Sequence, residues 1–598
     1  MSGRIDKTEL IKKLRDLEGL TDEEKSNLIG LLRQHKKYGL VWEDKPEDVE
    51  ERLREELPVL KEVKERALIS DQPDAPNHIL IEGDNLEALT ALSYTHEGKI
   101  DVIYIDPPYN TGNKDFVYND SYVDTEDSYR HSKWLSFMSK RIHIAKQLLS
   151  DKGVIFISID DNEQANLRQL CDSIFLSSNY CGTFVWRKKS GGGQTDQFFV
   201  TEHEYVLVYQ KTTSFTWLDK KISVESSSFK YKDERGLYNL TKLEKWGSAA
   251  HREDRQSMYF PINNPQSEEY YPIAPDGKPG RWRVGKPRMD YLEKNGLIEW
   301  RRNVPYEKKY YNGDDSKIIK ARSILYEIGE TGDGSNMLTE IFGEKDSFNN
   351  PKPLSLIKEL LTHNTNNTIL DFFAGSGTTL HATMQLNAED GGHRQCILVT
   401  NNENGICEQV TYERNKRVIQ GYTTPKGQAV EGLHDNNLRY YRTEFIPRER
   451  TQCNMRALVN AATDLLCIKE NLYEQKPLLG TLKLKPQLAR YFSDGQKHML
   501  VVYREEVVNE LVEAIKPLEL GSSILKIYIF SPGRYAFDDD FYEVQDKVQL
   551  VALPAAIYDA YQRVLPKQKE RLLVEAEEPA PQPTASVMTI DFEEGGEQ

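Results

Sequence analysis

The chain carries the stretch ILDFFAGSGTT at residues 369–379. Its apolar beginning is typical of a buried strand, and Gly375 and Gly377 are typical of a tight turn, because glycine adopts positive φ and allows close approach to the backbone. Ser376, Thr378 and Thr379 are expected to cap the helix that continues to Met384. Strand, turn and helix in this order predict an α/β fold whose turn can hold an anionic group of a ligand at a helix amino end.

The turn excludes one class of activity. It lacks the lysine of the phosphate loop G-x-x-x-x-G-K-[ST], and that loop occurs nowhere else in the chain. Nucleotide hydrolysis is therefore unsupported. A glycine-rich turn alone does not name the cofactor.

A second motif, Asp106-Pro107-Pro108-Tyr109, follows the apolar run of residues 102–105. An adenine amine is a poor nucleophile because its lone pair is delocalised, so a catalyst must accept hydrogen bonds from it. The Asp106 carboxylate and the carbonyls of a rigid proline pair are such acceptors, and they need no reorganisation during reaction. Tyr109 offers a face on which a base drawn out of a duplex can stack. The motif thus predicts chemistry on a base amine.

The alternative is a plain turn that ends a strand, since proline rarely continues one. Against it stands the second loop-forming stretch, Asn110 to Asn113, which prolongs the segment at the strand's carboxyl end. Open parallel sheets bind ligands at that edge.

Two acidic residues also follow predicted strands. Glu403 comes after the strand of residues 396–400, at the spacing expected of a ribose ligand. Asp84 closes the strand near residue 81 and opens a helix, where it is either a ligand or an N-cap. An exposed loop acid is the alternative for Glu403.

With these motifs in this order, the chain resembles the β-class amino-methyltransferases, and among them the modification subunit of type III restriction-modification systems. The resemblance covers most of the chain. The matching blocks are residues 37–43, 83–86, 105–120, 153–163, 350–353, the glycine turn, 400–404 and 412–414.

The resemblance implies a role for each matched residue. It implies a catalytic role for Asp106, Pro107, Pro108 and Tyr109. It implies binding of S-adenosylmethionine by residues of five short segments: Asp84, Lys352, Pro353, Asp371, Phe373, Ala374, Gly375, Ser376, Gly377, Thr378 and Glu403. An Asp at the first motif position resembles adenine-directed enzymes, whereas cytosine N4 enzymes of this class more often carry Ser.

The expected activity is therefore transfer of a methyl group from S-adenosylmethionine to adenine N6 at a short site in double-stranded DNA. The resemblance further implies a homodimer that joins a helicase-nuclease restriction subunit. A cytoplasmic location is expected because no apolar stretch reaches the length of a membrane span and the first residues start no secretory signal. Two alternatives stay open. One is a solitary DNA or RNA amino-methyltransferase, and the other is a non-catalytic DNA-binding specificity module.

Charge at first argues against DNA binding, because the chain carries a net charge of −16 and phosphate contacts dominate such affinity. Charge is local, however: residues 181–330 contain 26 Lys and Arg against 21 Asp and Glu. Within that region, basic residues interleaved with aromatics predict DNA contact. The candidates are Arg187, Lys188, Lys189, Arg281, Arg283, Arg288, Arg301 and Arg302. The alternative is a solvated basic surface.

The predicted fold class is α/β, a doubly wound parallel sheet, which the resemblance identifies as a Rossmann-like methyltransferase sheet in permuted order. Expected strands lie near residues 100–105, 153–159, 180–186 and 203–209, and expected helices near 134–149 and 163–176. The predicted parts are a helical amino-terminal arm at 1–70, a catalytic half at 71–211, an inserted target-recognition domain at 212–345, a cofactor-binding half at 346–445, a small α/β domain at 446–570 and an acidic disordered tail at 571–598.

Other features favour plain structural roles. No apolar run is long enough to span a membrane. The six cysteines show no CxxC spacing, so no metal site is expected. Asp160, Asp161 and Glu163 lie where a strand passes into a helix, a place that favours carboxylates. Glu202, His203 and Glu204 are predicted to lie on the exposed face of a strand.

Overall fold

The structure is a computed structural model that describes residues 41–113, 115–119, 121–191, 198–223, 225–313, 316–345, 347–363 and 368–566. Most of the predicted amino-terminal arm and the predicted acidic tail lie outside these ranges. The chain divides into two compact units. Unit 2 comprises Trp217–Arg322 and Thr362–Thr365, and unit 1 holds the remainder.

A ten-stranded sheet forms the centre of unit 1. Its strands stand in this order: β1 (Glu56–Glu62), β22 (Asn437–Pro447), β2 (Asn77–Glu82), β19 (Gln395–Thr400), β18 (Thr368–Asp371), β3 (Ile100–Ile105), β6 (Leu149–Ile159), β8 (His203–Gln210), β7 (Tyr180–Arg187) and β17 (Ile324–Leu325). The six strands from β22 to β6 are mutually parallel. The central strands of this set are largely apolar, as in the QCILVT of β19, because helices cover both faces.

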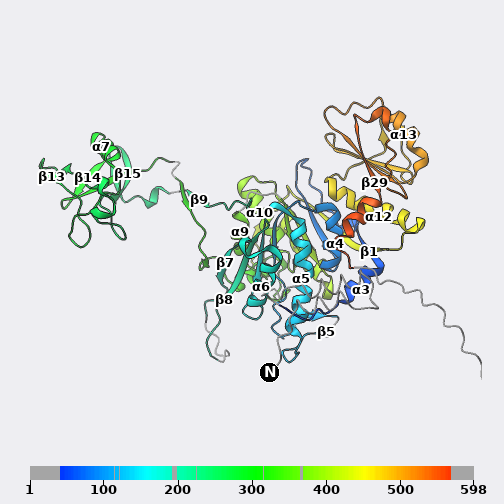
Figure 1. Cartoon of the computed structure of the whole chain (residues 1–598), viewed down its shortest axis with the longest axis horizontal. Coiled ribbons are helices and arrows are strands. Elements are labelled where there is room, and N and C mark those ends of the chain that lie inside the picture. The colour runs from blue at the N-terminus through cyan, green and yellow to red at the C-terminus, as the bar shows by residue number, and fades with distance from the viewer. Residues whose placement is uncertain are drawn as a thin grey trace, which may run out of the picture. The chain divides into compact units, whose positions relative to one another are not determined.

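Three helices pack along one face of this sheet: α4 (Asn85–His96), α5 (Arg130–Leu148) and α6 (Gln164–Phe175) (Figure 1). Ile79 of β2, Ile103 of β3 and Ile155 of β6 belong to the core that these helices cover. Leu80 and Val102, on the opposite face, are also buried. A sheet covered in this way leaves its strand ends as the place for a site.

The centre of the sheet contains a topological switch point. From β3 the chain passes through α5 to β6, whereas from β18 it passes through α10 (Thr378–Asp390) to β19 on the other side. β3 and β18 are adjacent and parallel, although more than 260 residues separate them in sequence. Open α/β sheets bind ligands in the crevice at such a point, outside the carboxyl ends of the strands. Both sequence motifs follow these two strands.

The expected strands and helices of the catalytic half are present, but the sheet is not wholly parallel. β8 runs antiparallel to both β6 and β7. No helix lies between β7 and β8 in the described residues, and a parallel neighbour would need a long crossover. The helix expected at residues 134–149 begins earlier, at Arg130.

The prediction of a helical arm is wrong for residues 56–62. After α3 (Asp48–Glu55), residues Glu56–Glu62 form the edge strand β1, antiparallel to β22. Leu57, Val59 and Leu60 are buried there, and Pro58 is tolerated because β1 is an edge strand. Helical spacing of leucines earlier in the arm does not extend to this segment.

Unit 2 is shorter than the predicted insertion of residues 212–345. β17 pairs with β7 and α8 (Thr331–Phe342) belongs to unit 1, so the main segment of unit 2 ends at Arg322. It contains a four-stranded sheet, α7 (Lys286–Lys294) and a small core around Trp282, Met289 and Leu292. The strands of that sheet, in spatial order, are β10 (Tyr231–Asp233), β11 (Gly236–Lys242), β15 (Val304–Tyr310) and β14 (Ile298–Arg301).

The carboxyl-terminal part contains a second, smaller sheet, as its apolar runs predict. Its strands, in spatial order, are β23 (Gln475–Lys476), β26 (Ala489–Ser493), β27 (His498–Val502), β28 (Leu525–Phe530) and β29 (Val548–Leu553). Helix α13 (Val508–Ile515) packs in the core of this sheet. Helices α12 (Gln452–Glu470) and α14 (Ala555–Tyr561) share a core with α4 and β1, so this part belongs to unit 1. Within the described residues, no helix is both long and apolar enough to cross a membrane.

Candidate functional site

A cavity of about 350 Å³ opens at the carboxyl ends of four adjacent parallel strands. Asp84 follows β2, Glu403 follows β19, Phe373 follows β18 and Pro108 follows β3, and all four residues line it. These strands are neighbours in the sheet although their order in the sequence is different. The structure thus brings one member of the catalytic motif and three predicted cofactor ligands to one place.

The Asp106 carboxylate lies beside this cavity with its two oxygens in different surroundings. Its Oδ1 is 2.8 Å from the Tyr109 hydroxyl and 3.0 Å from Lys352 Nζ. Its Oδ2 has no hydrogen-bond partner among the described residues. The carbonyl of Pro108 accepts a hydrogen bond from Trp134 Nε1 at 2.7 Å. The motif is therefore anchored on one side and has a free acceptor on the other.

Glu204, on β8, is the residue that the sequence interpretation missed. Its predicted position on an exposed strand face is wrong, since only 7% of the residue is accessible. Its Oε2 is 3.0 Å from the Tyr109 hydroxyl and 3.2 Å from Lys352 Nζ, and its Oε1 is 3.2 Å from Lys188 Nζ. The available signal was parity, because Glu204 alternates with the buried Val206 and Val208.

Lys352 joins the two carboxylates. Its ammonium contacts Asp106, Glu204 and, at 2.9 Å, the Tyr109 hydroxyl. The sequence placed Lys352 with the cofactor, but its side chain lies with the catalytic motif and does not line the 350 Å³ cavity. We call the five residues Asp106, Tyr109, Lys188, Glu204 and Lys352 the charge cluster.

Burial and charge act against each other on the pKa values of this cluster. Burial raises the pKa of the Asp106 carboxyl, and Glu204 raises it further, although Lys352 opposes both. Burial acts on Glu204 too, but Lys352 and Lys188 outweigh it and hold the pKa of Glu204 below its usual value. For Lys352 the two carboxylates outweigh burial and raise the pKa. Lys352 therefore stays cationic and Glu204 anionic.

The loop after the motif is held by a buried acid. Glu163 is fully buried, and its Oε1 lies 2.6 Å from both Asn110 Nδ2 and His131 Nδ1. Asn110 adopts a positive φ of 58°, so this contact stabilises an unusual backbone conformation directly after Tyr109. Across the described ranges, no group of three or more His, Cys, Asp or Glu side chains is arranged for a metal ion.

The glycine turn has the conformation that its sequence predicts. Gly375 and Gly377 have φ values of +48° and +76°. A Cβ on Gly377 would lie 2.4 Å from Asn415 Nδ2, and one on Gly375 would lie 3.0 Å from the Phe348 ring. The predicted capping is wrong, because Gly377 itself is the N-cap of α10 and no side chain caps it.

The hydroxyls predicted as caps make other contacts. Arg414, which is buried, donates from Nη1 to Ser376 Oγ at 3.0 Å and to Thr378 Oγ1 at 2.7 Å. Thr379 donates to the buried carboxylate of Asp371, which also accepts from the backbone N–H of Phe373. Burial raises the pKa of Asp371 to about 7. These contacts stabilise the turn, but none of Asp371, Ser376 or Thr378 lines the cavity.

The position of Asp84 agrees with both of its predicted roles, N-cap and cofactor ligand. It is the N-cap of α4, accepting from Leu86 N at 2.7 Å, and it also lines the cavity. Beside it lies the buried Arg141, whose guanidinium is 2.9 Å from Glu47 Oε1 and 3.6 Å from Asp84 Oδ1. An arginine on the apolar face of a helix was the signal for this unpredicted member of the cavity wall.

The predicted DNA-binding cations differ in whether another protein group already pairs with the side chain. Lys188 belongs to the charge cluster, and Arg187 lies 3.5 Å from Glu330. In unit 2, Arg288 pairs with Glu307 at 2.9 Å and Arg301 with Glu299 at 2.6 Å. Arg281 donates to the carbonyl of Ala249. Among the described residues, the side chains of Arg283 and Arg302 have no such partner. The backbone N–H of Lys189 donates to the carbonyl of Glu202 at 3.4 Å.

Comparison with known proteins adds the family. The family model described as DNA methylase matches residues 100–420. The chain is 33% identical to the type II methyltransferase M.KpnI of Klebsiella pneumoniae, over 62% of this chain and 92% of that protein. It is 33% identical to the Mod subunit of the type III restriction-modification enzyme EcoPI of Escherichia phage P1, over 54% of this chain and 58% of that subunit.

The chain thus spans almost all of one relative but little more than half of the type III Mod subunit. Among solved structures, the M1.HpyAVI–SAM complex matches with 12% identity and a TM-score of 0.28, covering 56% of this chain and 98% of that one. A TM-score this low adds nothing to the fold described above. The family model, in contrast, spans both motifs and more than half of the chain. The chain therefore belongs to the DNA methylase family, and its cofactor is S-adenosylmethionine.

Proposed function

We propose that the protein methylates adenine N6 at a short DNA sequence, as the modification and recognition subunit of a type III restriction-modification system. The observation that carries this proposal is the asymmetry of Asp106. Oδ1 is held by Tyr109 and Lys352, while Oδ2 remains an open acceptor at the switch point of the sheet. A fixed acceptor of this kind is suited to hold an amine.

In the proposed mechanism, Asp106 Oδ2 and the Pro107 carbonyl accept hydrogen bonds from the two N–H groups of the target amine. This draws the nitrogen lone pair out of the ring and aims it at the cofactor. The ring of Tyr109 supplies a face for the flipped base. S-adenosylmethionine, when bound, supplies the electrophilic methyl group. The amine loses its proton after the new bond forms, so no strongly basic residue is required.

The cavity fits this cofactor chemically. Phe373 and Phe137 offer aromatic surface, and Asp84 and Glu403 offer carboxylates for hydroxyl and amine groups. Its position at four strand ends is where α/β sheets bind nucleosides. We assign Asp84, Phe373 and Glu403 as direct contacts. We assign Lys352, Pro353, Asp371, Ala374, Gly375, Ser376, Gly377 and Thr378 to the support of that wall.

The choice of adenine rests on Asp106 at the first motif position, which resembles adenine-directed members of the class. The type III assignment rests on similarity to the EcoPI, StyLTI and EcoP15I Mod subunits, of which the chain spans 52% to 61%. As such a subunit the protein would act on double-stranded DNA, form a homodimer and bind a restriction subunit. Unit 2 would carry target recognition, together with Arg187, Lys188 and Lys189 near the site.

The decisive experiment is methylome sequencing of cells that express the wild type or Asp106→Ala. We expect N6-methyladenine at one short motif with the wild type and none with the variant. The variant should still bind S-adenosylmethionine in a titration, because Asp106 does not line the cavity. Unchanged methylation in the variant would refute the catalytic assignment. Failure of the wild type to bind the cofactor would favour a non-catalytic DNA-binding module.

The assembly is tested separately by copurification. A tagged chain expressed with its neighbouring genes should retain a large helicase-nuclease subunit. Site-specific methylation by a chain that retains none would make it a solitary methyltransferase, and the similarity to M.KpnI would then be the better guide.

A further inference from the structure

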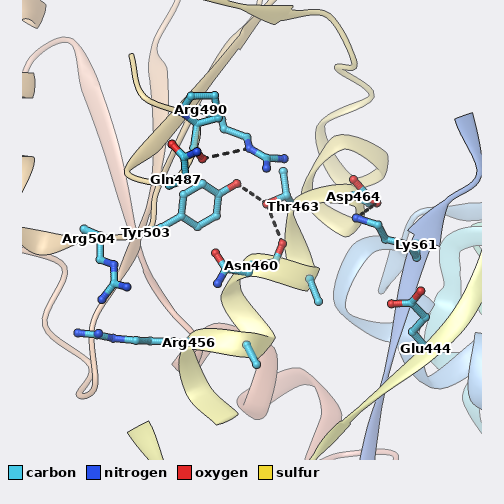
Figure 2. Close-up of a pocket in the computed structure, with 13 residues that line it drawn as sticks. Lys61, Glu444, Arg456, Asn460, Thr463, Asp464, Gln487, Arg490, Tyr503 and Arg504 are labelled. Carbon is cyan, nitrogen blue, oxygen red and sulfur yellow. Dashed lines mark hydrogen bonds and ion pairs between the residues drawn. The ribbon is translucent and has the colours of Figure 1, made fainter. Parts of the chain in front are cut away.

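A second cavity, of about 500 Å³, lies away from the charge cluster, where α12 meets the end of the small sheet and the edge of the large one. Lys61 of β1 and Asp464 of α12 face each other on one side, 3.4 Å apart, near Glu444. Arg456, Arg490 and Arg504 come from the other elements (Figure 2). We call this space the arginine cavity.

The arginine cavity has an excess of positive charge. Four cations and two carboxylates line it, and one cation, Lys61, is paired with Asp464. Among the described residues, neither Arg490 nor Arg504 forms an ion pair. Arg456 approaches a carboxylate only at 4.0 Å, that of Glu505. The net charge of the chain is −16, so three arginines with so few acidic partners form a locally positive region.

Arg456 also leaves a hydrogen-bond donor unused. Its Nε is buried and has no hydrogen-bond partner within the part of the chain that the structure describes. A buried donor without a partner lowers stability, so such groups in native proteins call for an explanation. Figure 2 shows the Arg456 side chain extending from α12 toward the strand end that carries Arg504. The two guanidinium groups line the same space, and the Glu505 carboxylate lies 4.0 Å from Arg456 Nη2.

The position in the fold is that of a ligand site. β27, β28 and β29 are parallel, and Tyr503 and Arg504 directly follow the carboxyl end of β27. Parallel α/β sheets bind ligands outside these ends. The Tyr503 hydroxyl is tied to Thr463 Oγ1 at 2.6 Å, which connects α12 to this strand end. The volume lies within the range of about 300–1,000 Å³ typical of small-molecule sites.

We propose that the arginine cavity binds a phosphate group, held chiefly by Arg456 and Arg504 with Arg490 on the opposite wall. The planar fork of guanidinium matches phosphate oxygens, and its five donors suit an anion with several acceptors. The phosphate belongs either to a small free anion, such as a nucleotide, or to the backbone of bound DNA. This inference does not depend on the proposed adenine specificity or on the type III assignment.

The test uses the full-length protein and inorganic pyrophosphate as the probe. Isothermal titration at low salt compares the wild type, the double variant Arg456→Gln/Arg504→Gln and the control Arg534→Gln. Arg534 is an exposed arginine of the carboxyl-terminal part that pairs with Asp559 outside the cavity. We expect the double variant to bind at least about tenfold more weakly, since it loses charge-assisted hydrogen bonds, and the control to bind as the wild type does.

A second variant and a second ligand complete the test. Arg504→Lys keeps the charge but not the fork, so its pyrophosphate affinity should fall between those of the wild type and the double variant, and its thermal unfolding checks the fold. The affinity for duplex DNA is then measured in all four proteins. Weaker pyrophosphate binding with unchanged DNA affinity identifies a free anion as the ligand. Weaker binding of both, with pyrophosphate competing, identifies backbone phosphate. Absence of pyrophosphate binding in the wild type, or equal affinity in all proteins, overturns the proposal.

Discussion

The two oxygens of the Asp106 carboxylate have different surroundings, because protein groups contact Oδ1 and leave Oδ2 without a described partner. Oδ1 faces the hydroxyl of Tyr109 and the ammonium of Lys352, and this fixes the plane of the group. Tyr109 has one hydroxyl proton, so it donates either to Asp106 or to Glu204 but not to both at once. Glu204 therefore influences the proposed catalytic carboxylate through two shared partners, Tyr109 and Lys352, without touching it.

Glu204→Gln tests this positioning role. Loss of the Glu204 charge removes a cause that raises the pKa of Asp106 and leaves Lys352 to pair with Asp106 alone. We expect the acid limb of the pH profile of kcat/KM to move to lower pH. We also expect kcat to fall about tenfold or more, because charge-assisted hydrogen bonds are lost, with little change in KM for S-adenosylmethionine.

The matched control for this experiment is Glu202→Gln. Glu202 is exposed and lies outside the charge cluster. Its pH profile should coincide with that of the wild type. An unshifted acid limb in Glu204→Gln, with only lower stability, would show that Glu204 is merely structural.

Asp371 predicts a pH dependence of stability. Its pKa rises from 3.8 to about 7 on folding because the carboxyl is buried. Between these values the folded state keeps a proton that the unfolded state has released, so the contribution of Asp371 to stability decreases as pH rises, by at most about 1.4 kcal/mol per pH unit. Urea unfolding from pH 4 to 7 should show this decline in the wild type.

The comparison variant is Asp371→Asn, which cannot release a proton. Its free energy of unfolding should decline less steeply over the same pH range, while the exposed control Asp435→Asn should follow the wild type. Parallel curves for all three proteins would mean that Asp371 titrates normally in the folded state.

At the scale of the element, α10 is a helix with a left-handed glycine at each end. Gly377 precedes it with φ +76° and Gly391 follows it with φ +69°. A Cβ on Gly391 would meet open space, whereas one on Gly377 would meet Asn415 Nδ2. Asn415 is buried and its amide donates to the carbonyls of Gly377 and Thr411, so it cannot easily move away.

Gly377→Ala and Gly391→Ala therefore separate backbone strain from steric collision. Gly391→Ala should cost about 1 kcal/mol, the cost of a left-handed alanine. Gly377→Ala should cost about 1–3 kcal/mol more because of the collision, and it should also weaken binding of S-adenosylmethionine. Denaturant unfolding measures the first effect and calorimetric titration the second. Equal destabilisation by both substitutions would remove the steric argument.

At the scale of the whole molecule, the net charge is −16, so attraction to DNA must come from local groups of cationic side chains. Arg302, at the turn between β14 and β15, has no acidic partner among the described residues, whereas Arg288 is paired with Glu307. We expect Arg302→Gln to weaken duplex binding and to reduce the slope of log K against log[salt] by about 1. Arg288→Gln should have a smaller effect, since its charge is already compensated. Similar slopes for both variants and the wild type would exclude Arg302 as a phosphate contact.

Local features were predictable because they depend on neighbouring residues. Apolar runs identified β3, β19, β27 and β28, and glycine at positive φ was expected in the turn after β18. The errors occur where distant contacts decide. Glu56–Glu62 became a strand because β22 offers a partner for its edge, and β8 turned antiparallel because no helix connects it to β7. Ser376 and Thr378 did not cap α10 because Arg414 reaches them from another helix.

The sequence by itself predicted the chemistry, since the acceptor motif at Asp106 and the glycine turn at Gly375 are each complete within a few residues. Only the tertiary structure decided that they meet, because β3 and β18 pair across a long stretch of intervening chain. It alone revealed that Glu204 and Arg141 belong to the site and that Lys188, a predicted DNA contact, pairs with Glu204. Charged residues gain such roles by burial beside opposite charge, and burial depends on which strands and helices pack together rather than on the residues next in the chain.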